Sequence, residues 1–202
     1  MRYSSFLIVL CCLLFIVVGC PQAKNDDLAV KTTTDYGKEA ARRVEESGGC
    51  KYSEADYTNS DYGFSFKYPS NWSIPVDLQS DKTAVIAVRT AVAGDFTANF
   101  TVGIEKADSD LLKARKSLYQ SAYQSYMTNL KILTFEHGKL NNLDTVFLHN
   151  QGVIKEVPTE QIQYFFNNRD KLYVLTSSYS PENAEQVQKE LDAILATFKI
   201  GP

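Results

Sequence analysis

The stretch Asp61-Tyr62-Gly63-Phe64-Ser65-Phe66-Lys67-Tyr68-Pro69-Ser70-Asn71-Trp72 carries an aromatic residue at every second position from 62 to 68. Successive side chains of a strand point to opposite faces, so the pattern predicts one apolar face, formed by Tyr62, Phe64, Phe66 and Tyr68. Pro69 has no amide hydrogen for a sheet, so the strand is expected to end there and to lead Trp72 back over the core. The rest of the chain is expected to supply the sheet and helices that bury this aromatic face.

Length and charge favour one globular domain with a tail. The chain has 202 residues, of which 44% are hydrophobic and 22% charged, and its net charge is −3. Its 21 basic residues are scattered among 24 acidic ones, and the Arg42-Arg43 pair is assigned to a solvated linker. A phosphate backbone needs a clustered basic face, so nucleic acid is not an expected partner.

The N-terminus indicates export. Arg2 precedes an unbroken apolar run, Phe6–Val18, which has the length of a secretory signal and is shorter than the roughly 18–20 residues of a membrane-spanning helix. Val17-Val18-Gly19-Cys20 follows and resembles the bacterial lipobox, in which a small residue precedes a cysteine that is lipidated and becomes the new N-terminus. The alternatives are a plain signal peptide cut nearby and an uncleaved anchor.

The lipobox resemblance implies that residues 1–19 are a signal peptide and that Cys20 carries three acyl chains. More than one chain gives stable anchoring, so we expect a protein anchored to a membrane of the bacterial cell envelope, on its extracytoplasmic side. Cys11 and Cys12 would leave with the signal, and Cys50 would have no partner for an internal disulfide. Cys50 is interpreted as an inert thiol in a linker, and intermolecular pairing or reactivity is the alternative.

Residues 20–56 are expected to form the lipidated N-terminus and a flexible linker, because large apolar residues are rare there. Within this linker, Asp35 to Ser47 is interpreted either as a short helix, capped by Asp35 and ended by Gly48-Gly49, or as disorder. The globular domain is expected to span residues 57–202. After the aromatic strand, alternation predicts a hairpin with one strand at 84–88, a second at 96–104 and a turn at Ala93-Gly94-Asp95.

Residues 109–130 take up helical spacing, with Asp108 or Ser109 as the cap. One side of this helix carries a tyrosine row, formed by Tyr119, Tyr123 and Tyr126. The row is a candidate interaction surface. The alternative is a helix that lies on the sheet with its tyrosine rings packed and its hydroxyls reaching water.

Four strands and a helix complete the predicted domain. The strands are expected at 132–138, 144–154, 162–166 and 172–179, with turns at Asn141-Asn142 and at Asn167-Asn168-Arg169-Asp170. Ser180 and Pro181 begin the last helix, whose apolar stripe consists of Ala184, Val187, Leu191, Ile194, Leu195 and Phe198. The expected fold is of the α+β class, with about seven mainly antiparallel strands and two main helices.

This order of elements, together with Tyr62-Gly63-Phe64-Ser65-Phe66-Lys67-Tyr68-Pro69 and Trp72, resembles the PsbP-like proteins, including bacterial lipoproteins of the DcrB kind. The resemblance spans roughly residues 57–200. It implies an α/β/α sandwich around a central antiparallel sheet, shared with the Ran-binding Mog proteins. No metal-binding or photosystem-docking residue of PsbP matches a position here, so neither a cofactor nor a metal is expected.

Motifs of established enzyme classes are missing from the sequence. If Asn141-Asn142 forms a two-residue turn, His137 pairs with Val146 and His149 faces the other side of the sheet, whereas a one-residue bulge would place the two histidines together. Two functions are therefore considered. The first is a noncatalytic module that docks an envelope protein or stabilises a complex. The alternative is a small-ligand carrier or hydrolytic enzyme with a site between sheet and helix, drawing on Glu136, Glu160, His137 or His149.

Overall fold

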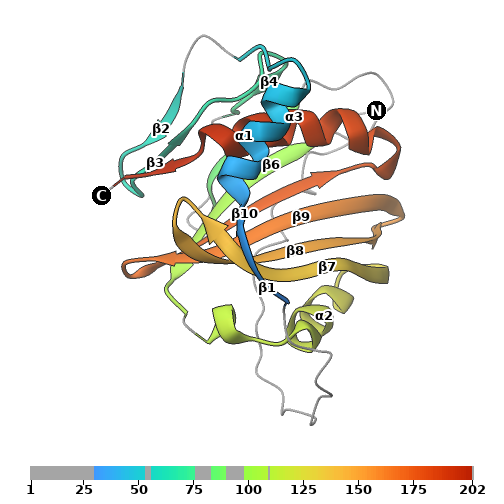
Figure 1. Cartoon of the computed structure of the whole chain (residues 1–202). Helices are drawn as coiled ribbons and strands as arrows, with labels where there is room; N and C mark the ends of the chain where they lie inside the picture. The colour runs from blue at the N-terminus through green and yellow to red at the C-terminus, as the bar shows by residue number, and fades with distance from the viewer. Residues whose placement is uncertain (1–29, 53–55, 76–82, 90–97, 109, 202) are drawn as a thin grey trace.

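A computed structural model describes residues 30–52, 56–75, 83–89, 98–108 and 110–201. Its main sheet has eight strands in the order β1-β7-β8-β9-β10-β6-β5-β4, and a second sheet has the order β11-β3-β2 (Figure 1). The main-sheet strands are β1 (Val30–Asp35), β4 (Trp72–Ser73), β5 (Thr83–Arg89), β6 (Asn99–Lys106), β7 (Thr128–Leu140), β8 (Leu143–Ile154), β9 (Val157–Asn168) and β10 (Lys171–Tyr179). Those of the second sheet are β2 (Tyr57–Asn59), β3 (Phe64–Phe66) and β11 (Lys199–Ile200).

Helices cover both faces of the main sheet, which gives the expected sandwich. The helices of the described residues are α1 (Tyr36–Glu46), α2 (Lys116–Gln124) and α3 (Ala184–Thr197), with two short 3-10 turns, η4 (Leu111–Lys113) and η5 (Pro181–Asn183). One core, between the main sheet and α1, α3 and the small sheet, is built around Phe66, Phe166 and Phe198. The other lies under α2 and contains Tyr119, Phe135 and Phe165. Strand pairing is antiparallel in the described residues, apart from β1, which runs parallel to β7.

The prediction of a flexible linker over residues 20–56 is wrong from Val30 onward. β1 pairs with β7, and α1 packs on α3 with Tyr36 and Ala40 buried in the core. Asp35 caps α1 through hydrogen bonds from the backbone amides of Gly37 and Lys38, as the helical interpretation predicted. The globular body therefore begins well before residue 57, and β1 and α1 account for part of the difference from the expected seven strands and two main helices.

The aromatic stretch turns its rings inward, but it does so in the small sheet. Phe64 and Phe66 are buried in β3 and contact each other and Phe198, while the chain turns at Tyr62 and at Gly63, whose φ is 66°. β3 is therefore only three residues long. Trp72 is buried in β4 at the edge of the main sheet.

The hairpin at Asn141-Asn142 has the predicted register. Both asparagines have positive φ, Leu140 pairs with Leu143, and His137 pairs with Val146. The helix predicted over 109–130 is shorter than expected: Asp108 accepts hydrogen bonds from the amides of residues 110 and 111 at the start of η4, α2 ends at Gln124, and β7 begins at Thr128. The stripe of α3 is packed as predicted. The turn predicted at 93–95 and Ser109 lie outside the described residues.

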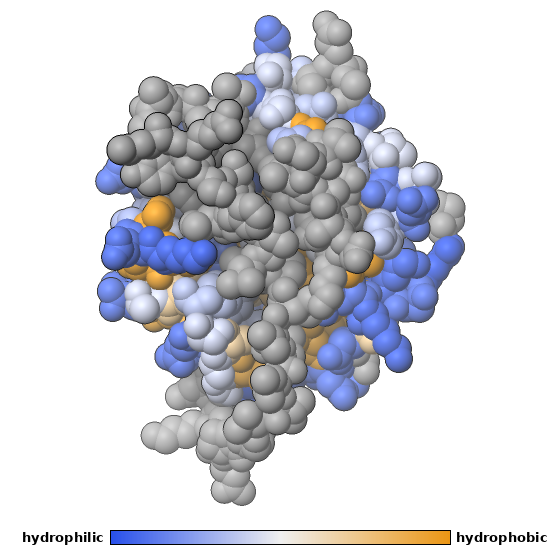
Figure 2. Space-filling model, turned by 180° about the vertical axis from the view of Figure 1, so that it is seen from behind, coloured by the Kyte–Doolittle hydropathy of each residue, from blue (hydrophilic) through white to orange (hydrophobic). Residues whose placement is uncertain are grey.

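On the face shown in Figure 2, hydrophilic residues predominate at the margins. Hydrophobic residues show on this face in several separate areas. Among the described residues, the large hydrophobic side chains that are exposed are Val30, Leu118 and Leu133. None of these three is aromatic, and several tyrosines of the described residues, including Tyr57, Tyr62 and Tyr68, are partly exposed.

Candidate binding site

A pocket of about 330 Å³ lies between the main sheet and helices α1 and α3, and we call it the sheet–helix pocket. Its lining residues belong to β1, β6, β7, β8, β9 and β10 on one side and to the two helices on the other. Its apolar lining consists of Tyr36, Phe100, Phe147, Ile162, Tyr164, Leu191 and Leu195. Ligand pockets commonly have volumes of about 300–1,000 Å³ and mainly apolar walls with a few polar groups, so this pocket has the form of a small ligand site.

One row of the pocket floor is fixed by strand register. His149 in β8 pairs with Ile162 in β9, and Ile162 pairs in turn with Ser177 in β10. Neighbouring strands are about 4.8 Å apart, so His149 and Ser177 stand roughly 9–10 Å from each other. A general base must come within about 3 Å of the hydroxyl that it activates. The two residues therefore do not form a nucleophile–base pair, although both line the pocket.

A buried hydrogen-bonded chain holds the histidine. His149 Nε2 lies 2.5 Å from Oε1 of Glu160, and the Tyr179 hydroxyl donates to the same oxygen over 3.0 Å. Oε1 of Glu160 is the acceptor of the Tyr179 bond, and a carboxylate acceptor assigns the donor role to Nε2 of His149. Burial, aided by Glu160, raises the pKa of Tyr179, which therefore remains a donor at neutral pH.

Tyr36 forms the pocket wall next to β7. Its ring lies against Gly138, where a Cβ would come within 2.7 Å of Tyr36 Cε2, and stacks on Phe147 with 5.1 Å between ring centroids. Burial raises the pKa of Tyr36 to about 12, and the nearby Thr32 side chain opposes part of that rise. The Thr32 hydroxyl donates its own hydrogen to the carbonyl of His137. The buried Tyr36 hydroxyl has no hydrogen-bond partner.

An ion pair closes the roof of the pocket. Arg43 of α1 donates from Nη2 and Nε to the two carboxylate oxygens of Asp192 in α3, over 2.6 and 2.7 Å. This pairing raises the pKa of Arg43, which therefore keeps its charge. The assignment of Arg42-Arg43 to a solvated linker is wrong for Arg43, because its partner lies 149 residues away in sequence. The spacing of Tyr36, Ala40 and Val44 at i, i+4 and i+8 is the sequence signal that would have revealed a docked helix.

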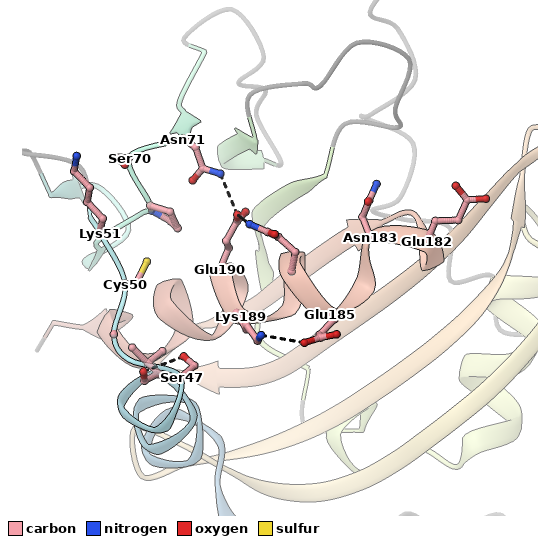
Figure 3. A pocket seen from close by; sticks show the side chains of 14 residues that line it. Ser47, Cys50, Lys51, Ser70, Asn71, Glu182, Asn183, Glu185, Lys189 and Glu190 are labelled. Atoms are coloured by element: carbon pink, nitrogen blue, oxygen red, sulfur yellow. Dashed lines mark hydrogen bonds and ion pairs between the residues drawn. The ribbon is translucent and has the colours of Figure 1, made fainter.

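A second concave feature, which we call the open groove, lies between the end of α1, the turn at 69–71 and the start of α3 (Figure 3). It has a volume of about 560 Å³. The buried Glu190 links its sides, since it accepts hydrogen bonds from Asn71 Nδ2 over 3.0 Å and from Trp72 Nε1 over 2.8 Å. Along α3, Lys189 pairs with Glu185.

Cys50 lies on the wall of the open groove (Figure 3). Burial, with a smaller contribution from the Glu190 carboxylate, raises the pKa of its thiol. A raised pKa leaves less thiolate at neutral pH, so this environment makes the thiol less reactive than a free cysteine. Cys50 therefore lies in the folded body and not in the linker in which it was predicted.

The tyrosine row does not form an exposed surface. Tyr119 and Tyr123 are buried against the sheet, and Tyr126 is half-buried beside Tyr123. The Tyr119 hydroxyl donates to the carbonyl of Leu111 instead of reaching water. The prediction of an interaction surface at these tyrosines is therefore wrong, because α2 packs this side onto the second core.

The structure brings together three of the four polar residues considered for a site. Glu136 and His149 both line the sheet–helix pocket, and Glu160 holds His149. His137 is excluded, because it shares the opposite face of the sheet with Phe135 and Val146, as the hairpin register predicted. Within the described residues, no cluster of three or more histidine, cysteine, aspartate or glutamate side chains is arranged to hold a metal ion.

Cys20 and the whole predicted signal lie outside the described residues, so lipid anchoring stays a prediction. None of the helices in the described parts of the chain is both long and apolar enough to cross a membrane.

Comparison with known proteins identifies the family. The family model of the PsbP-like proteins matches residues 8–200. The chain belongs to the PsbP-like family. This match also includes β1 and α1, which the resemblance noted from residue 57 onward left out. A search of curated proteins found no sequence match.

Two solved structures share the PsbP-like fold with this chain. Cyanobacterial PsbP (CyanoP) from Synechocystis sp. PCC 6803 is 16% identical, with a TM-score of 0.52, over 72% of this chain and 91% of that one. LpqN, described as involved in cell envelope biogenesis of Mycobacterium tuberculosis, is 11% identical, with a TM-score of 0.54, over 80% of this chain and 96% of that one. At these identities the likeness concerns the fold alone.

Proposed function

We propose that this PsbP-like protein is a lipid-anchored, noncatalytic binding module of the bacterial cell envelope that holds a small ligand in the sheet–helix pocket. The observation that carries the proposal is the pocket itself, in which a histidine and a carboxylate meet aromatic walls. A site between sheet and helix was predicted for the ligand carrier, whereas the predicted interaction surface was the tyrosine row. Burial of the tyrosine row therefore favours the carrier.

The geometry of the floor supports binding without reaction. A hydrolytic enzyme of the serine type needs a base beside its nucleophile, and Ser177 is two strands away from His149. His149 is engaged by Glu160, and Arg43 by Asp192, so both groups are positioned as fixed walls of the pocket. The hydrolytic alternative is therefore the weaker one.

Residue Thr134 gives a direct test of ligand binding. It lines the pocket from β7, so Thr134→Trp is expected to fill the cavity, whereas Thr128→Trp adds the same side chain to an exposed position of the same strand. Native mass spectrometry of the full chain, isolated in detergent from its own cells, should show a bound small molecule in the wild type and in Thr128→Trp and not in Thr134→Trp. An equal ligand load in all three proteins, or none in any of them, would contradict a ligand role for the pocket.

Anchoring rests on Val17-Val18-Gly19-Cys20 and is consistent with the envelope role stated for LpqN. We expect labelled palmitate to be incorporated into the wild-type chain and not into Cys20→Ala, and the wild type to sediment with membranes. Cys50→Ala is the matched control and should behave like the wild type. Unmodified wild-type protein in the cytosol, still carrying residues 1–19, would refute anchoring.

Docking of an envelope protein is the second candidate function, and the open groove is the observation that favours it. Its polar walls come from three segments, of which Glu190 links two, α3 and residues 71–72. A photo-crosslinking residue at Lys51, inside the groove, should capture one protein in intact cells, and the same residue at the exposed Lys131 of β7 should not. Recovery of lipid alone from both positions would argue against docking.

A further inference from the structure

We propose that the ligand of the sheet–helix pocket is a small organic cation, an amine or a quaternary ammonium compound held between the Glu136 carboxylate and the aromatic wall. This inference rests on the proposed ligand-binding function and specifies its chemistry. It joins two separate observations: the charges around the pocket and the aromatic rings beside them.

The charges of the lining favour a cation. Three carboxylates line the pocket, those of Glu39, Glu136 and Asp192, against the single guanidinium of Arg43. Asp192 is neutralised by Arg43, and Glu39 is paired at the rim with Arg42. Glu136 is different, because it has no hydrogen bond or ion pair with any of the described residues. A half-buried carboxylate without a counter-ion attracts a positive ligand more strongly than an exposed one, because less water screens it.

The floor reinforces this negative character. Behind His149, which lines the pocket, stands the buried carboxylate of Glu160. The pocket therefore has one carboxylate in its lining at Glu136 and a second one behind His149. A ligand ammonium group that carries hydrogens can donate to the Glu136 carboxylate.

The aromatic wall suits the same ligand. Tyr36, Phe147 and Tyr164 contact one another with ring centroids 5.1 to 5.3 Å apart, and all three line the pocket. The faces of aromatic rings attract ammonium groups, and groups of such rings are a common means of recognising quaternary ammonium. Tyr36 is 94% buried and contributes its ring to this wall.

An anionic ligand fits less well. The one guanidinium in the lining, that of Arg43, already makes two short hydrogen bonds to Asp192. An anion would have to displace that carboxylate from a buried position and would then meet Glu136 as well. Both steps are unfavourable.

A pair of isosteric probes tests the inference. Choline and 3,3-dimethylbutan-1-ol have the same shape and differ in the charged nitrogen, so their relative affinity isolates the contribution of charge. With the full wild-type chain in detergent micelles, saturation-transfer NMR and calorimetric titration should show choline binding about tenfold more tightly than the neutral alcohol. Glu136→Gln is expected to reduce this preference about fivefold. Glu45→Gln removes the same charge from an exposed position of α1 outside the pocket and should leave the preference unchanged.

Each other outcome has a distinct meaning. Equal binding of the two probes would overturn the cation assignment while leaving the ligand-binding function in place. A preference for choline that Glu136→Gln and Glu45→Gln alter equally would overturn the placement at Glu136. Binding of neither probe would also overturn the inference. The native mass spectrometry of Thr134→Trp would then test the proposed function separately.

Discussion

Replacing Arg43 by glutamine tests whether α1 is an integral part of the domain. Arg43 makes two hydrogen bonds to Asp192, a carboxylate that is nearly buried, with side-chain exposures of 38% and 10% for the two partners. Breaking a fully buried ion pair by removing one partner costs about 3–5 kcal/mol. Since Arg43 is partly exposed, solvent screens some of this interaction, and we expect Arg43→Gln to lower the free energy of unfolding by about 1.5–2.5 kcal/mol.

The neighbouring Arg42 provides a matched control. It is more exposed and pairs with Glu39 and Glu46 on its own helix, so Arg42→Gln should cost less than about 0.5 kcal/mol. Chemical denaturation at neutral pH measures both values, and thermal unfolding should show a drop of about 4–8 °C for Arg43→Gln. A double-mutant cycle with Asp192→Asn should give a coupling energy of at least about 1 kcal/mol. If the two arginine variants lose the same small amount of stability, α1 is not held on α3 and the reasoning is refuted.

Two further predictions concern packing and thiol chemistry. Gly138→Ala would place a Cβ 2.8 Å from a backbone carbonyl oxygen, so it should lower the free energy of unfolding by about 1–3 kcal/mol, whereas Gly37→Ala, with no atom nearer than 3.5 Å, should be neutral or slightly stabilising. Denaturant titration of both variants would contradict this if their effects were equal. Because burial and Glu190 raise the pKa of Cys50, its alkylation by iodoacetamide should be slower at pH 8 than in the unfolded chain and should increase at higher pH; equal rates would show that the thiol is unperturbed.

Local sequence chemistry predicted several elements correctly. Asn141 and Asn142 tolerate left-handed backbone, and the turn that they form fixed the register and placed His137 and His149 on opposite faces. The apolar stripe of α3 was also predictable from its helical period. The turn at Lys155-Glu156 was not predicted, because neither residue favours the positive φ that it adopts there.

The candidate site was only partly predictable. His149, Glu136 and Glu160 were named because their residue types suit a polar site, and the pocket contains or supports all three. Tyr36 and Arg43 were missed because the polar composition around them indicated a linker. Composition reports the average character of a segment, whereas docking of α1 depends on a few contacts with distant residues.

The sequence alone determined the elements whose signals are local: the hairpins, the amphipathic helix α3, and the inward direction of Phe64 and Phe66. Only the tertiary structure decided that Tyr36 lies over Gly138 and that Arg43 meets Asp192, pairs separated by more than a hundred residues. Periodicity and turn chemistry act over a few residues, but a pocket forms where separate segments pack, and that arrangement is set by the packing of the whole chain.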